Sequence, residues 1–250
     1  MSADQPIIQF DAVVAGYSPS LTILNGTTLD ARAGEITLLI GPNGAGKSTV
    51  LKTLFGMLTP RSGEVRFEGR CINGSSQREL LSRGVAFVPQ GRNLFGSLSV
   101  RHNLELGGIA LGRSVLHERM EEVLARFPRI RERLDNQAST LSGGEQKQLE
   151  VGRALLRRPR VLLIDEPSIG LSPKIVQDVF TLLRALADAG TTVLMVEQNV
   201  RAALGYSDRA LVLEMGRLAL DKPASELLND PNLNRLFLGG HAPAAPAAGA

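Results

Sequence analysis

The apolar residues of this chain fall into short uninterrupted runs and into helically spaced patterns. Runs such as Val161–Ile164 and Val193–Val196 are apolar throughout and have the length of strands. Continuous runs of this kind are typical of strands that are buried on both faces of a parallel sheet. The pattern predicts strands over residues 7–14, 36–40, 64–67, 85–88, 161–165, 191–196 and 210–213.

Amphipathic helices are predicted between these strands. Within 116–127 the apolar residues recur three or four positions apart, which is helical spacing. A second helix is predicted over 174–189, because Pro173 stands directly before it and Gly190 directly after it, and these are common start and stop residues. Buried strands that alternate with helices predict an α/β fold around a largely parallel sheet.

The same pattern divides the chain into regions. Residues 93–158 show helical patterns and no convincing strand, so we expect a helical subdomain inserted into a core formed by 1–92 and 159–238. Residues 239–250 are rich in alanine, glycine and proline and lack large apolar side chains, which predicts a disordered tail. We find no internal repeat.

Composition narrows the class of protein. Of the 250 residues, 43% are hydrophobic and 21% are charged, as in ordinary globular proteins. No apolar run approaches the ~20 residues that span a bilayer, and the N-terminus carries no secretory signal. Cys71 is the only cysteine, which excludes an internal disulfide and suits the cytoplasm. The net charge of +3 and the absence of Trp argue against a nucleic-acid partner, whereas a small basic excess suits an anionic membrane surface.

The most specific motif is a glycine-rich loop. Residues 41–48 read G-P-N-G-A-G-K-S, which fits G-x-x-x-x-G-K-[ST], and they follow the predicted strand 36–40 and precede a predicted helix over 49–55. Glycines allow successive backbone N–H groups to face one phosphate. Lys47 would then reach the β- and γ-phosphates, and the Ser48 hydroxyl would bind Mg²⁺. The alternative, a glycine-rich turn that matches by accident, arises about once in a hundred chains of this length.

Two further motifs carry polar chemistry. The predicted strand 161–165 ends in Asp165, followed by Glu166, so that Asp165 could hold Mg²⁺ and Glu166 could orient or deprotonate an attacking water. Taken alone, these two could simply be solvated acids at a strand end. In the segment L-S-G-G-E-Q, Ser142 can cap a helix that begins near Glu145, and its two glycines leave N–H groups uncovered at a positive helix end. Because this second phosphate motif lies on the predicted helical insert, it could serve a nucleotide bound by a neighbouring subunit.

Together the P-loop, the glutamine loop around Gln90, the L-S-G-G-E signature and the Asp-Glu strand resemble the ATP-binding subunits of ABC transporters, over residues 7–238. The resemblance implies an α/β P-loop NTPase fold: a RecA-like core with an N-terminal antiparallel β-subdomain and an α-helical insert. It also implies that two subunits dimerise head to tail, so that each signature closes on the ATP of the other.

The resemblance also assigns roles to individual residues. It implies that Tyr17 stacks on adenine, although a tyrosine packed on the sheet is the alternative, and that Gln90 contacts Mg²⁺ and links the core to the insert. Catalysis is assigned to Glu166 and Gln198. The ATP-binding set is Tyr17, Gly41, Pro42, Asn43, Gly44, Ala45, Gly46, Lys47, Ser48, Thr49 and Gln90; the Mg²⁺ set is Ser48, Gln90 and Asp165; the signature set, in contact with the partner's ATP, is Leu141, Ser142, Gly143, Gly144 and Glu145.

Two positions depart from the general family pattern. Gln198 occupies the place of the switch histidine, and its amide can donate a hydrogen bond but cannot carry charge. Ser172 occupies the place of an aspartate that normally helps couple the two ATP sites. Both changes are compatible with the subtype described next, and both bear on how fast this site hydrolyses ATP.

The segments 88–95, 166–173 and 196–200 resemble the LivF-type ATPase of branched-chain amino-acid importers. The resemblance implies a peripheral protein on the cytoplasmic face of the plasma membrane, paired with a second related ATPase or with itself, two permease subunits and, indirectly, a periplasmic or surface solute-binding protein. The P-Q-G-R stretch is closer to the ATPases of urea and short-chain amide importers, which remain an alternative. Less favoured alternatives are a soluble ABC ATPase acting on DNA or ribosomes, an exporter ATPase, and a P-loop kinase.

Overall fold

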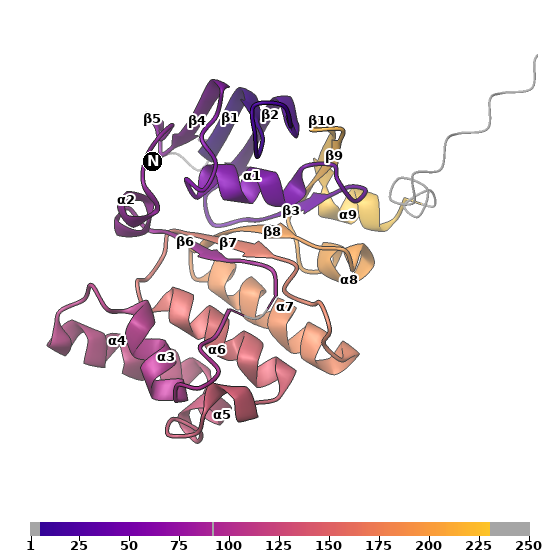
Figure 1. The fold of residues 1–250 in the computed structure, drawn as a ribbon. Coiled ribbons are helices and arrows are strands. Elements are labelled where there is room, and N and C mark those ends of the chain that lie inside the picture. Colours follow the sequence, from indigo (N-terminus) through magenta and orange to yellow (C-terminus); the bar gives the residue numbers. More distant parts are fainter. Residues whose placement is uncertain (1–5, 92, 231–250) are drawn as a thin grey trace, which may run out of the picture.

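The computed structural model describes residues 6–91 and 93–230, which form two β-sheets and the helices packed on them (Figure 1). The central sheet has the strand order β10-β9-β3-β8-β7-β6, and every neighbouring pair is parallel except β10 and β9. The predicted α/β fold around a largely parallel sheet is therefore confirmed. Its strands are β3 (Ile36–Ile40), β6 (Val85–Val88), β7 (Val161–Asp165), β8 (Thr192–Val196), β9 (Arg209–Glu214) and β10 (Arg217–Pro223).

A second sheet, entirely antiparallel, has the order β2-β1-β4-β5. It is the N-terminal antiparallel β-subdomain that the family resemblance implied. Figure 1 shows it at the top, with α1 (Lys47–Leu54) between it and the central sheet. Its strands are β1 (Pro6–Ala15), β2 (Leu24–Arg32), β4 (Ser62–Phe67) and β5 (Arg70–Cys71).

Three observed strands were absent from the sequence prediction, which was wrong at these places. β2 alternates buried with exposed positions, β5 has two residues, and β10 has no fully buried residue. None of the three therefore contains the uninterrupted apolar run on which the prediction relied. By contrast, every residue of β3, β7 and β8 is buried, and each of these strands was predicted to within one residue.

The two faces of the central sheet belong to two apolar cores. Leu38 and Ile40 of β3 pack into one core with α6 (Gly143–Leu155) and α7 (Pro173–Asp188), whereas Leu39 packs into the other with α1 and the antiparallel sheet. The helices that flank the strands are α1 (Lys47–Leu54), α2 (Gln77–Ser82), α7 (Pro173–Asp188), α8 (Val200–Leu204) and α9 (Ala224–Leu228). The predicted helix 174–189 is confirmed, with Pro173 as its first residue and Gly190 in a left-handed turn after it.

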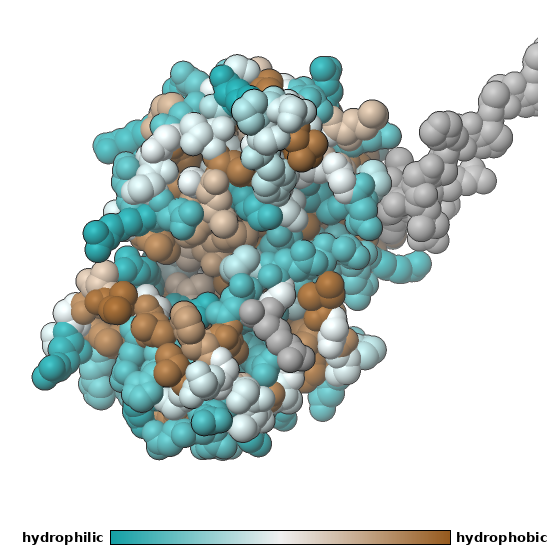
Figure 2. All heavy atoms as spheres, in the orientation of Figure 1, coloured by the Kyte–Doolittle hydropathy of each residue, from teal (hydrophilic) through white to brown (hydrophobic). Residues whose placement is uncertain are grey.

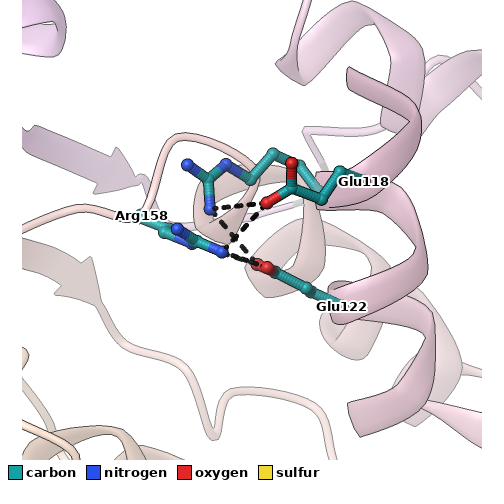
Figure 3. Close-up of polar contacts among 4 residues, drawn as sticks. Glu118, Glu122 and Arg158 are labelled. Carbon is teal, nitrogen blue, oxygen red and sulfur yellow. Dashed lines mark hydrogen bonds and ion pairs between the residues drawn. The ribbon is translucent and has the colours of Figure 1, made fainter. Parts of the chain in front are cut away.

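The described residues between 93 and 158 contain no named strand. They form α3 (Val100–Gly107), α4 (Arg113–Arg126), α5 (Pro128–Arg131), a short 3-10 helix (Ala138–Thr140) and α6 (Gly143–Leu155), the lower part of Figure 1. Figure 3 shows how α4 is joined to the segment after α6: Glu118 and Glu122 project from α4 toward Arg158. Arg158 Nε donates to Glu122 Oε2 at 3.0 Å, and Arg158 Nη2 lies 3.4 Å from Glu118 Oε1. Among residues 6–91 and 93–230, no helix is both long and apolar enough to cross a membrane.

The turn between β9 and β10 allows a matched stability prediction. Gly216 has φ +75° and a Cβ there would lie 1.9 Å from the carbonyl oxygen of Ile23, whereas Gly34 has φ +74° with no atom within 4 Å of such a Cβ. Gly34→Ala should cost about 1–2 kcal/mol because a side chain disfavours left-handed backbone. Gly216→Ala should cost about 1–3 kcal/mol more, because the clash is with backbone. Urea denaturation of both variants checks this, and equal losses would contradict it.

Candidate functional site

The loop between β3 and α1 is a tight turn, and two of its positions, Gly41 and Gly46, require glycine. Gly41 has φ +147°, and a Cβ there would lie 2.1 Å from the carbonyl oxygen of Leu213. Gly46, with φ +104°, occupies the N-cap position of α1. The hairpin between β9 and β10 supports the loop from outside, because Gly216 N donates to Ala45 O at 3.0 Å. The strand, loop and helix order predicted for residues 36–55 is therefore present, with the helix beginning at Lys47 rather than Thr49.

Lys47 folds back over this loop. Its Nζ donates to Gly41 O at 2.8 Å and to Pro42 O at 3.0 Å, and the side chain is buried. Burial lowers the pKa of the Lys47 ammonium, and the nearby Glu166 and Asp165 charges oppose that effect. A phosphate bound at the loop would stabilise the charged form of the buried Lys47 ammonium. This position is therefore suited to bind phosphate.

Ser48 and Asp165 meet at the end of β7. Ser48 Oγ donates to Asp165 Oδ1 at 3.1 Å. Burial raises the pKa of Asp165, and the Glu166 charge adds to it, whereas the Ser48 hydrogen bond and the Lys52 and Lys47 ammoniums lower it. A bound cation would favour the ionised carboxylate. The pair offers one hydroxyl and one carboxylate, which suits Mg²⁺, since that ion takes few protein ligands and completes its shell with water and substrate phosphate. Among the described residues, no three His, Cys, Asp or Glu side chains could hold a metal by themselves.

Glu166 lies between two glutamine amides. Gln90 Nε2 donates to Glu166 Oε2 at 2.6 Å, and Gln198 Nε2 donates to Glu166 Oε1 at 2.6 Å. The Glu166 backbone has φ +48°, a conformation that costs a non-glycine residue energy, and its N–H donates to Val196 O at 2.9 Å. The three side chains come from the ends of β6, β7 and β8, so the parallel sheet brings them together. The sequence did not predict that both amides would converge on one carboxylate.

Tyr17 lies at the rim of the same site. Tyr17 is 50% exposed, and its stacking on adenine stays a prediction. Lys52 Nζ donates to Tyr17 Oη at 3.1 Å and lies 5.2 Å from the ring centroid. Tyr17 lines one cavity of 240 Å³ together with Ile23, Asn43, Gly44, Gly46, Lys47, Ser48, Thr49 and Glu166.

The L-S-G-G-E segment lies elsewhere in the chain. Ser142 caps α6 as predicted, because its Oγ accepts from Glu145 N at 3.3 Å while Glu145 Oε2 accepts from Ser142 N at 2.8 Å. The helix begins at Gly143, two residues earlier than predicted. Gly144 packs closely on α7, where a Cβ would lie 2.7 Å from Ile175 Cγ2. Leu141 is buried, and Gly143 lines a cavity that shares no residue with the P-loop cavity. Within one chain, the structure does not bring the signature to the P-loop.

A polar cluster that the sequence analysis missed joins the Gln90 loop to α6. Asn93 N donates to Glu150 Oε1 at 2.8 Å, and Asn93 O accepts from Arg153 at 2.7 Å. The Asn93 amide also donates to Gln90 O at 3.3 Å. Glu150 forms a buried ion pair with Lys147 at 2.6 Å. In the sequence, the sign of this cluster was the charged pair Lys147 and Glu150, three residues apart on α6. Charged pairs at this spacing also occur on solvent-exposed helices, so the pair did not identify the cluster.

In sequence and in structure, this chain is similar to ATP-binding proteins of ABC transporters. The sequence profile of the ABC transporter family matches residues 24–169. The high-affinity branched-chain amino acid transport ATP-binding protein BraG of Pseudomonas aeruginosa is 42% identical over 234 residues, covering 94% of this chain and 100% of that protein. The probable branched-chain amino acid transport ATP-binding protein LivF of Archaeoglobus fulgidus is 38% identical, covering 90% and 95%. The crystal structure of an ATP-binding cassette of an ABC transporter, in its ADP conformation, matches with a TM-score of 0.85 and 27% identity, covering 94% of this chain and 100% of that one.

Proposed function

The chain belongs to the ABC transporter family as an ATP-binding, ATP-hydrolysing subunit, and from that premise we propose that it drives uptake of branched-chain or other hydrophobic amino acids. The observation that carries the proposal is the 42% identity with BraG over the whole length of that protein. A urea or short-chain amide importer is the alternative substrate class, because of the P-Q-G-R stretch that begins at Pro89. The position of Arg92 in that stretch lies outside the described residues.

In the proposed site, the P-loop from Gly41 to Thr49 binds the ATP phosphates through its backbone N–H groups and the Lys47 ammonium. Tyr17 stacks on the adenine. Ser48, Asp165 and the amide oxygen of Gln90 would hold Mg²⁺, which would neutralise charge on the ATP phosphates. The chemistry of the Ser48 and Asp165 oxygen donors supports this assignment.

Glu166 is the proposed general base, and Gln198 is its proposed companion. A carboxylate in the P-loop cavity can orient the water that attacks the γ-phosphate and take its proton. Gln198 can hold that carboxylate in place and donate a hydrogen bond. Gln90 must exchange its hydrogen bond with Glu166 for contacts to the bound nucleotide, which couples the loop after β6 to nucleotide binding.

The signature segment from Leu141 to Glu145 is proposed to contact ATP bound by a second subunit, either a related ATPase or another copy of this chain. Its separation from the P-loop cavity of its own chain supports this. We also propose the division into a nucleotide-binding core, 1–92 and 159–238, and a helical subdomain, 93–158. The proposed boundary at 92, residues 231–238 and the tail 239–250 lie outside the described residues.

Two membrane permeases are the proposed partners, which would place the chain at the cytoplasmic face of the plasma membrane, with a solute-binding protein acting indirectly. An apolar hollow supports this: a cavity of 270 Å³ lies between β6, α2 and the helices α3 and α6, with Phe87, Leu106 and Ile109 in its lining. Ile109 is 75% exposed. Figure 2 shows apolar residues on both sides of a hollow between the upper and lower parts of the molecule. A permease helix seated there would contact the loop that carries Gln90.

Capture of the tagged chain from detergent-solubilised membranes of its source, followed by mass spectrometry, tests the proposal. We expect two distinct polytopic permeases and a second ATPase with the wild-type chain, and loss of the permeases with Ile109→Arg. Met215→Arg is the matched control, because Met215 is 79% exposed but lies on the β9–β10 turn. Recovery with ribosomes or DNA-repair proteins would contradict a transport role. The ligand of the associated binding protein would separate amino acids from urea and amides.

A further inference from the structure

Glu197, directly after β8, is a buried carboxylate to which the proposed mechanism assigns no role. Its side chain is 2% exposed. Oε1 accepts from Ser168 N at 2.7 Å, and Oε2 accepts from Ser168 Oγ at 2.8 Å. Oε2 also accepts from the backbone N–H groups of Gln198 at 3.0 Å and Asn199 at 3.1 Å. No salt bridge to Glu197 is found within 6–91 and 93–230. A buried charge held only by hydrogen bonds is costly wherever those bonds are incomplete.

These bonds join two loops that carry the proposed catalytic pair. Ser168 lies two residues after Glu166 in the loop that follows β7, and Gln198 and Asn199 lie in the loop that follows β8. The loops are also joined by the hydrogen bond between Gln198 Nε2 and Glu166 Oε1 at 2.6 Å. Glu197 therefore fixes the backbone on both sides of the Gln198–Glu166 contact. The cavity of 370 Å³ beside it is lined by residues of both loops.

We propose that Glu197 is a positioning residue for ATP hydrolysis: it holds the two loops in the register that lets the Gln198 amide reach the Glu166 carboxylate. The proposal rests on the roles proposed for Glu166 and Gln198. Glu197 is not among the residues that line the P-loop cavity, so its loss should affect the hydrolysis step and not the binding of ATP.

Glu197→Gln tests the proposal, because the amide keeps the size of the side chain but turns an NH₂ group toward backbone donors. In the full-length chain with MgATP, we expect kcat to fall about tenfold to a hundredfold, the loss that small misplacement of a catalytic group produces. The KM for ATP should stay within about twofold. Hydrogen exchange should accelerate either at the Ser168 amide or at the Gln198 and Asn199 amides, since the glutamine retains only one acceptor oxygen and its NH₂ group takes the place of the other. Glu118→Gln is the control, because Glu118 is an exposed carboxylate on α4, paired with Arg158 (Figure 3).

Ser168→Ala is the second variant, in case Glu197→Gln does not fold. It removes the hydroxyl bond and leaves the bonds to Gln198 and Asn199, so kcat should fall in the same direction but less. In the double variant the two losses should be non-additive, because both act through one contact. A purely structural role would instead lower the melting temperature and leave kcat unchanged below it.

Measuring Glu166→Gln in the same assay distinguishes a failure of the positioning role of Glu197 from a failure of the proposed role of Glu166 as the base. If Glu166→Gln abolishes hydrolysis while both Glu197→Gln and Ser168→Ala keep wild-type kcat, the positioning role is overturned and the base assignment stands. If Glu166→Gln hydrolyses ATP at the wild-type rate, the base assignment itself fails. Unchanged exchange of the three amides in Glu197→Gln would also overturn the positioning role, independently of activity.

Discussion

Replacing Glu166 by glutamine is expected to abolish ATP hydrolysis while ATP binding persists. Glu166 lines the P-loop cavity, and each of its oxygens accepts a hydrogen bond from an amide. Glutamine has nearly the same shape but no negative charge, so it cannot take a proton from water. Its own NH₂ group would also face the donor of Gln90 or Gln198. Loss of a general base typically lowers the rate about 10²- to 10⁴-fold. Phosphate release measures the rate, and titration with a fluorescent ATP analogue measures binding.

The control for Glu166→Gln is Glu118→Gln, which removes an exposed carboxylate of α4 and should change neither quantity. The assay is most stringent in the complex recovered from membranes, where we expect turnover to be coupled to the permeases. Turnover at the wild-type rate in that complex would refute the assignment of Glu166 as the base. Loss of ATP binding together with hydrolysis would show that the side chain supports the P-loop cavity rather than the reaction.

Replacing Lys47 by methionine is expected to weaken ATP binding itself. The ammonium is buried at the P-loop and donates to two carbonyls of the loop that we propose binds the phosphates. A hydrogen bond to a charged group contributes about 1.5–3 kcal/mol, and so the Kd for ATP should rise about tenfold to 150-fold. Methionine keeps the apolar part of the side chain, and circular dichroism would verify the fold.

Lys52→Met is the matched control for Lys47→Met, because it removes a second ammonium from the same helix. Lys52 contacts Tyr17 at the rim of the site, whereas the hydrogen bonds to the Gly41 and Pro42 carbonyls come from Lys47. We expect its effect on the Kd for ATP to be several-fold smaller. Equal losses in the two variants would mean that the affinity for ATP depends on the overall positive charge of α1 and not on a specific contact of Lys47.

The elements with the strongest burial were the ones that could be predicted. β3, β7 and β8 are buried on both faces, so each is an unbroken apolar run that periodicity identifies. β10 exposes alternate residues and has no fully buried position, so its identity as a strand depends on pairing with β9. A half-exposed strand of this kind contains no uninterrupted apolar run, and this is why β10 was missed, although its partner is the preceding strand of the same hairpin.

The P-loop and the signature helix cap could also be predicted, because their geometry depends on neighbouring residues. Glycines at fixed spacing permit the left-handed turns of the loop, and a serine three residues before a glutamate forms a capping box. The family resemblance, which joined these local motifs, is confirmed by the family profile and by the similarity to BraG.

The sequence alone thus determined the α/β class, the family and the identity of the phosphate-binding loop, since each is encoded by composition or by residues within a few positions of one another. Only the tertiary structure decided which side chains meet: the amides of Gln90 and Gln198 on the carboxylate of Glu166, and the carboxylate of Glu197 on Ser168. These residues come from the ends of three parallel strands that are far apart in the chain. Such contacts follow from the order and register of β6, β7 and β8 in the sheet, which no local pattern specifies.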